Sequence, residues 1–83
     1  MKIEGVEITQ EQIDAALIVM GHKDGGLFLP FTCDDVERAL IRAGVPGPIK
    51  VGPSYRATDR ILQRERNAGR IKWMGGSIGW IKA

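Results

Sequence analysis

The feature that most constrains the fold of this chain is a helix-start signal that occurs twice. In the first copy Thr9 is the N-cap, Gln12 completes a capping box, and Ile8 and Ile13 flank it as a hydrophobic staple. Apolar residues then recur at helical spacing until the next glycine. The sequence therefore predicts a first helix over residues 9–21.

The second copy of the signal lies a short distance further along the chain. Phe31 and Val36 form a staple around Thr32, and two aspartates follow in the first turn, where the helix dipole favours anions. An apolar stripe then runs to Gly44, a residue type that commonly follows a helix end. A second helix is predicted over residues 32–43.

A third helix is predicted after residues 45–53, which hold three prolines and two glycines and cannot be helical. This helix begins at Ser54 and covers residues 54–68. At about 100° per residue its apolar residues share one side, except that Glu65 falls among them without a sequence-level reason. The polar side predicted from this spacing contains no acid and consists of Arg56, Arg60, Gln63 and Asn67, with Arg64 at its flank.

Residues 70–82 predict a β-hairpin. Gly75-Gly76 is a two-residue turn signal. The register it implies places Trp73 opposite Ile78 and Ile71 opposite Trp80, so that both tryptophans cover the core. Residues 27–30 are a predicted short third strand, and residues 1–8 a strand or ordered arm. The predicted buried residues are Ile13, Leu17, Leu40, Ile61, Trp73 and Trp80.

Charge is divided unevenly between the two halves of the chain. Residues 1–41 carry three cations and eight anions, a net charge of −5, whereas residues 42–83 carry nine cations and two anions, a net charge of +7. A segregated basic half is typical of proteins that bind a polyanion, most often nucleic acid. The alternative is a solvated surface whose acidic and basic halves face each other.

The length, the single cysteine and the absence of long apolar runs limit the classes of function that we expect for this chain. With 83 residues the chain predicts one domain, and its one cysteine excludes an internal disulfide and fits a reducing cytoplasm. No apolar run is long enough to span a bilayer, and no signal peptide is expected. His22 is interpreted as a surface residue, Cys33 as unreactive, and Asp34 and Asp35 as helix-terminal acids. We therefore expect no catalytic activity, cofactor or metal.

Three helices followed by a hairpin, with a basic third helix leading through a glycine into that hairpin, resemble the winged helix-turn-helix family. The resemblance covers the chain from about Thr9 to Ala83 and implies an α+β, mostly α fold, within a single predicted domain over residues 1–83. It also implies that the third helix lies in the major groove of duplex DNA, with the hairpin at 70–82 as a wing. The turn between the second and third predicted helices is longer than usual for the family. The extra length implies either an additional DNA contact through Lys50 or a domain that no longer reads DNA. The expected DNA-binding residues are Lys50, Ser54, Tyr55, Arg56, Arg60, Gln63, Arg64, Asn67, Arg70 and Lys72.

Two functions follow as hypotheses. The first is a small DNA-binding regulator of phage or prophage origin, acting as a homodimer or with a protein partner. Arg and Lys bind phosphate and guanine, and Gln and Asn match adenine, which is the chemistry of the predicted polar side. The second is a winged-helix interaction module, in which the acidic first two helices bind a basic protein.

Overall fold

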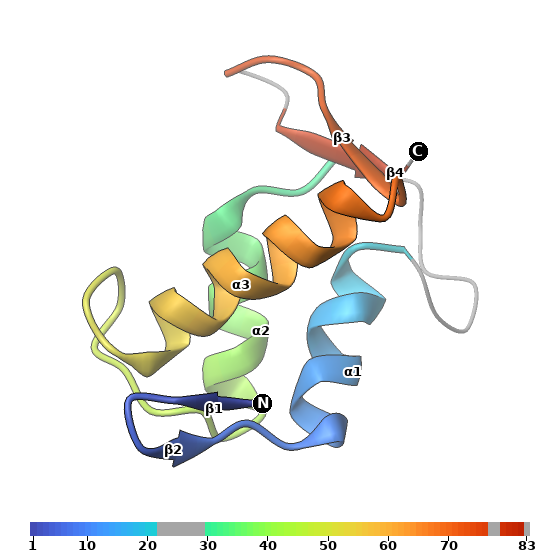
Figure 1. Cartoon of the computed structure of the whole chain (residues 1–83). Coiled ribbons are helices and arrows are strands. Elements are labelled where there is room, and N and C mark those ends of the chain that lie inside the picture. Colours follow the sequence, from blue (N-terminus) through green and yellow to red (C-terminus); the bar gives the residue numbers. More distant parts are fainter. Residues whose placement is uncertain (22–29, 77–78, 83) are drawn as a thin grey trace.

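A computed structural model describes residues 1–21, 30–76 and 79–82 of the chain, as three packed helices with a β-hairpin at each end of the third (Figure 1). The order is β1 (Lys2–Ile3), β2 (Val6–Glu7), α1 (Gln10–Val19), α2 (Cys33–Arg42), α3 (Pro53–Asn67), β3 (Ile71–Trp73) and β4 (Trp80–Lys82). The predicted α+β, mostly α fold is confirmed, and the layout is winged-helix-like. None of the helices in the described residues is long and apolar enough to cross a membrane.

The first two helices begin as the sequence predicts. The Thr9 hydroxyl accepts a hydrogen bond from the Gln12 backbone N–H at 3.2 Å, and the Gln12 side chain accepts one from the Thr9 N–H at 2.9 Å. Thr32 and Asp35 repeat both bonds at 3.2 and 2.9 Å. Each reciprocal pair satisfies two N–H groups that the first helical turn leaves without partners.

The third helix begins one residue earlier than predicted. Gly52 is the N-cap and Pro53 is the first helical residue, where its missing N–H costs nothing. Ser54 therefore does not start the helix. Its side chain is fully buried, and its hydroxyl donates to the Glu37 carboxylate at 3.0 Å.

The N-terminal segment is a short antiparallel hairpin, which confirms the strand alternative for residues 1–8. Lys2 pairs with Glu7 and Ile3 with Val6, leaving Glu4 and Gly5 as a two-residue turn. Both turn residues have positive φ, +49° and +81°, as a type I′ turn requires. This hairpin lies against the N-terminal part of α3 (Figure 1).

The C-terminal hairpin forms where predicted but in a different register. Ile71 lies opposite Lys82 and Trp73 opposite Trp80. The predicted pairing of Ile71 with Trp80 and the tight Gly75-Gly76 turn are therefore wrong, and Ser77 and Ile78 lie outside the described residues. Of the predicted third strand at residues 27–30, residues 27–29 also lie outside them and Pro30 is not part of a strand. The next residue, Phe31, forms an isolated bridge to Trp80.

The core lies between the three helices and the inner faces of the hairpins. Ile13, Leu40 and Ile61 are buried as predicted, whereas Leu17 and Trp80 are partly buried and pack against the core. Trp73 is 53% exposed, so its predicted burial is wrong. The other buried apolar residues are Ile3, Ile8, Ala16, Met20, Phe31, Val36, Ala39, Val45, Ala57, Leu62 and Ile71.

Candidate nucleic-acid interface

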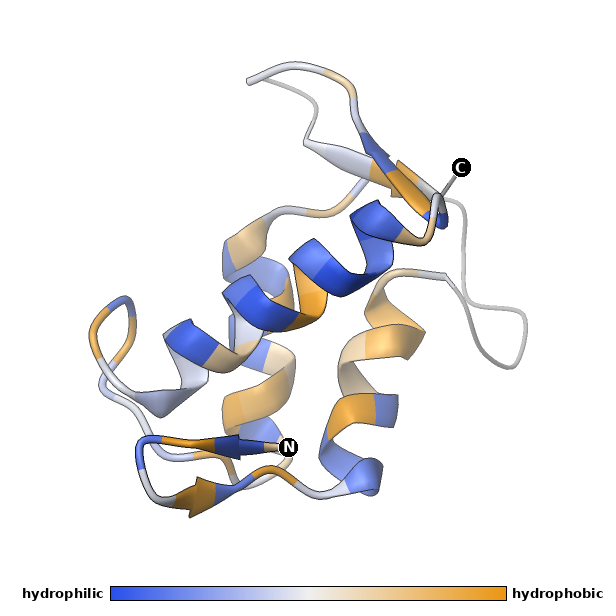
Figure 2. Ribbon diagram, viewed as in Figure 1, coloured by the Kyte–Doolittle hydropathy of each residue, from blue (hydrophilic) through white to orange (hydrophobic). Residues whose placement is uncertain are grey.

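The candidate interface is the side of α3 that faces away from the other helices. Hydrophilic residues run along this side for most of the helix (Figure 2). It carries six of the residues expected from the sequence, all exposed: Tyr55, Arg56, Arg60, Gln63, Arg64 and Asn67. The helical spacing therefore predicted correctly that Arg56, Arg60, Gln63, Arg64 and Asn67 meet solvent.

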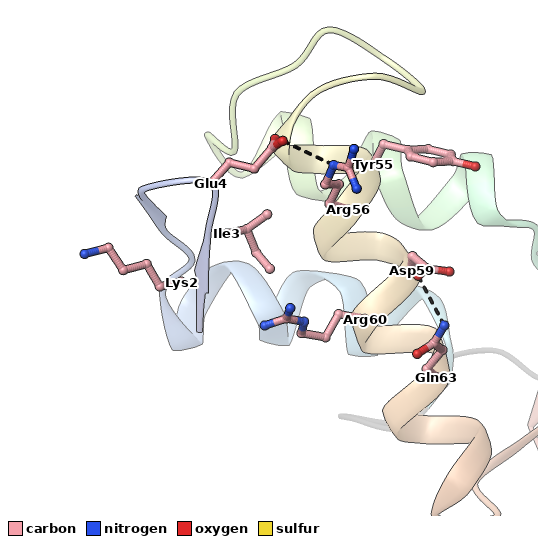
Figure 3. A pocket seen from close by; sticks show the side chains of 8 residues that line it. All are labelled: Lys2, Ile3, Glu4, Tyr55, Arg56, Asp59, Arg60 and Gln63. Carbon is pink, nitrogen blue, oxygen red and sulfur yellow. Dashed lines mark hydrogen bonds and ion pairs between the residues drawn. The ribbon is translucent and has the colours of Figure 1, made fainter.

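A groove of about 310 Å³ lies where the N-terminal half of α3 meets β1 (Figure 3). Arg60 extends from α3 toward β1, whereas the Lys2 side chain, which also lines the groove, points from β1 away from α3. The groove therefore gathers side chains from two elements far apart in sequence. Its lining consists of Lys2, Ile3, Glu4, Tyr55, Arg56, Asp59, Arg60 and Gln63.

The prediction that this side of α3 contains no acid is wrong. Asp59 is exposed on α3 and accepts a hydrogen bond from the Gln63 amide at 3.2 Å. Glu4, from the turn between β1 and β2, forms an ion pair with Arg56 at 3.2 Å (Figure 3). Periodicity within one helix could not show Glu4, because it comes from a separate element.

The ion pairs divide the candidate cations into two groups. Arg56 pairs with Glu4, and Arg64 and Arg70 pair with Glu65. Within residues 1–21, 30–76 and 79–82, the second group of cations makes no ion pair; it contains Lys2, Lys50, Arg60, Arg66 and Lys72. The second group can bind an external anion without first losing an internal partner.

Glu65 explains the position of the hairpin relative to α3. Its carboxylate is buried and accepts from Arg70 Nε at 2.9 Å and from Nη2 at 2.8 Å, while its carbonyl accepts the Arg70 backbone N–H at 3.0 Å. The hydrogen bond to Glu65, and then the attraction of its charge, raise the pKa of the Arg70 guanidinium above its ordinary value. Arg70 therefore fixes the chain between α3 and β3. The sequence predicted Arg70 to bind DNA, whereas in the structure its side chain stabilises the fold.

A buried carboxylate also fixes the long turn between α2 and α3. Glu37 is 2% exposed, and its Oε2 accepts the Lys50 backbone N–H at 2.8 Å as well as the Ser54 hydroxyl. Ser54 has no exposed surface for DNA, so the structure removes it from the predicted interface. The Lys50 side chain remains exposed, at the end of this turn.

Lys72 is exposed on β3 next to the buried Ile71. Because side chains alternate across a strand, Lys72 lies on the face of the hairpin opposite to the core. Two further cations were missed by the sequence interpretation. Arg66 could have been predicted, because helical spacing places it on the exposed side of α3. Lys2 could not, because it becomes part of the groove only through the packing of β1 on α3.

Among the residues that the structure describes, no cluster of three or more His, Cys, Asp or Glu side chains could hold a metal ion. Cys33 is exposed and free, and His22 lies outside the described ranges. No family model, curated protein or solved structure matches this chain. The functional argument therefore depends on the geometry and charge of the chain itself.

Proposed function

We propose that this protein binds duplex DNA, with α3 in the major groove and the β3–β4 hairpin on the flanking backbone. The observation that carries the proposal is the distribution of the cations that make no ion pair within the part of the chain that the structure describes. Arg60 and Arg66 lie on the exposed side of α3, Lys2 lies on the hairpin at one end of it, and Lys72 lies on the hairpin at the other.

The side chains on this surface match the chemistry of a DNA groove. Lys and Arg neutralise phosphates, and Arg can form two hydrogen bonds to guanine. Gln63 and Asn67 are exposed on the same side of α3 and can pair with adenine. Arg56 would exchange its Glu4 partner for DNA, so we expect it to contribute less than Arg60.

The biological role proposed here is a regulator in the cytoplasm, of phage or prophage origin, without catalytic activity. Few phosphates are within reach of one copy of a domain this small. Specific recognition would therefore use two copies on neighbouring half-sites or a protein partner.

Fluorescence anisotropy with labelled random-sequence duplex DNA tests the proposal. If Lys2, Arg60, Arg66 and Lys72 contact phosphates, the logarithm of the binding constant should fall against the logarithm of salt concentration with a slope of about −3 to −4. Arg60→Ala should weaken binding by about 1–3 kcal/mol if it contacts a base. Lys72→Ala should weaken binding to all sequences similarly and reduce the slope by about one.

Arg42→Ala is the matched control, because Arg42 is an exposed cation on α2, with no ion pair inside the described part of the chain, and lies outside the proposed interface. The Arg42→Ala variant should bind duplex DNA with the same affinity and the same salt dependence as the unaltered protein. No measurable duplex binding at about 50 mM salt would overturn the proposal. It would favour the interaction module, in which the acidic residues of α1 and α2 bind a basic protein.

A further inference from the structure

An aromatic cleft lies beside the C-terminal end of α3. Trp73, Trp80, Arg66 and Cys33 line a volume of about 420 Å³ that is open to solvent. The Trp73 side chain is 53% exposed there. A large exposed aromatic side chain next to a cation is a common feature of ligand-binding surfaces.

The exposed indole is held in a fixed orientation from behind. Trp73 lies edge-to-face against Trp80, with ring centroids 5.3 Å apart and planes at 64°. Trp80 is fixed in turn, because it exchanges two backbone hydrogen bonds of 2.9 and 2.8 Å with Phe31. A ligand that stacks on Trp73 would therefore meet a prearranged surface and would lose little affinity to ordering it.

Arg66 is the charged side chain of this cleft, and it makes no ion pair among the described residues. The neighbouring acids already have partners. Asp34 pairs with Arg38 at 2.9 Å, Asp35 accepts the Thr32 N–H, and Asp59 accepts the Gln63 amide. The cleft thus combines an aromatic face with an available positive charge, which complements a base joined to a phosphate.

The cleft is continuous with the proposed DNA interface. A second hollow of about 160 Å³ shares Cys33, Arg66 and Trp80 with it and extends to Asp59, Leu62 and Gln63 on α3. A DNA strand on the exposed side of α3 could therefore pass from Gln63 along this hollow to the cleft at Trp73.

We propose that this cleft takes an unpaired nucleobase, stacked on Trp73, with Arg66 on the adjoining phosphate. The inference rests on the proposed duplex binding and extends it: the preferred ligand is a duplex that continues into a short single strand. Stacking of bases on aromatic side chains is largely independent of base identity, so the preference should be for structure rather than sequence.

The test compares three DNA ligands of one duplex sequence: a blunt duplex, the same duplex with a short oligothymidine overhang, and the same overhang made of abasic nucleotides. The abasic overhang keeps the phosphates and removes the bases. We expect the thymidine overhang to bind about 5- to 100-fold more tightly than the blunt duplex, and the abasic overhang to recover only a small part of that gain. The thymidine overhang should also quench the fluorescence of the two tryptophans.

Two variants assign the gain to the cleft. For each variant the gain is its affinity for the thymidine-overhang duplex divided by its affinity for the blunt duplex. Trp73→Ala should abolish this gain, and Trp73→Phe should keep most of it. Met74→Ala is the matched control, because Met74 is an exposed neighbour outside the cleft, and it should keep the whole gain.

The inference fails if the blunt and overhang ligands bind equally, if the abasic overhang gives the full gain, or if Trp73→Ala retains it. Fluorescence quenching by an acidic peptide but not by the overhang would overturn it in favour of a protein ligand. Failure of the blunt duplex to bind would instead contradict the proposed function, so the two failures are distinguishable.

Discussion

The two hairpins at the ends of α3 contain similar turn signals but use them differently. In β1–β2 the turn signal fixes the pairing: Glu4-Gly5 is a two-residue turn with both φ angles positive, and Ile3 pairs with Val6 directly beside it. In β3–β4 the dipeptide Gly75-Gly76 does not fix the pairing, because Trp73 meets Trp80 rather than Ile78.

The difference lies in the second partner of β4. Trp80 pairs with Trp73 on one edge and exchanges backbone hydrogen bonds with Phe31 on the other. Gly79, directly before it, has φ +96° and passes so close to Phe31 that an added Cβ would lie 2.6 Å from the Phe31 carbonyl oxygen. The β1–β2 hairpin has no such second strand among the described residues. A turn dipeptide therefore governs register only where no tertiary pairing competes with it.

The largest expected effect is that of Gly79→Ala. The alanine would adopt an unfavourable φ and would also push against the Phe31 carbonyl. Together these effects should lower the free energy of unfolding by about 3 kcal/mol, measured from the urea midpoint at constant m. Gly76→Ala is the matched control, since no atom of the described residues lies within 4 Å of its added Cβ, and it should change stability by less than about 0.5 kcal/mol. Equal effects at the two positions would show that the approach to Phe31 does not set the register.

Truncation of the two tryptophans should give the next largest effect. It tests, through side-chain packing, the register that the pairing with Phe31 gives to the C-terminal hairpin. Trp80→Ala should lower the free energy of unfolding by about 2 kcal/mol, because Trp80 is partly buried and packs against the core. Trp73→Ala should cost less than about 1 kcal/mol, because it loses mainly the contact with the other ring. Thermal unfolding of both variants measures the difference. A larger loss for Trp73 than for Trp80 would contradict the register described here.

Local signals account for the parts of the fold that were predictable. The caps at Thr9 and Thr32 depend on residues three positions away, so the sequence alone specified both helix starts. The register of β4 was not predictable from the hairpin sequence because Phe31 lies far away along the chain. The start of α3 was misplaced by one residue because Ser54 resembles a cap but is buried against Glu37.

In the candidate interface, too, local sequence signals predicted the helix exposure but not the contacts that come from tertiary packing. Helical phase correctly predicted that Arg60 and Gln63 are exposed. It could not show that Glu4 neutralises Arg56 or that β1 adds Lys2 to the groove, because both follow from tertiary packing. The ion pair between Glu65 and Arg70 joins residues five positions apart, and Arg70 lies beyond the end of α3. Side-chain pairs within a helix are expected at spacings of three or four residues, so helical spacing did not predict this pair.

The smallest expected effect belongs to Gly5 in the tight hairpin. Its φ is +81°, but no atom in residues 1–21, 30–76 or 79–82 lies within 4 Å of an added Cβ, so Gly5→Ala should be destabilised by backbone strain alone. We expect a loss of about 1 kcal/mol, since a left-handed conformation costs about that much for a residue with a Cβ. Gly5→Asn should lose about half as much, because asparagine is accepted in type I′ turns. Urea midpoints of both variants measure these losses beside that of Gly79→Ala. If Gly5→Ala proves as destabilising as Gly79→Ala, backbone strain alone explains both glycines, and the contact with Phe31 adds nothing to the C-terminal hairpin.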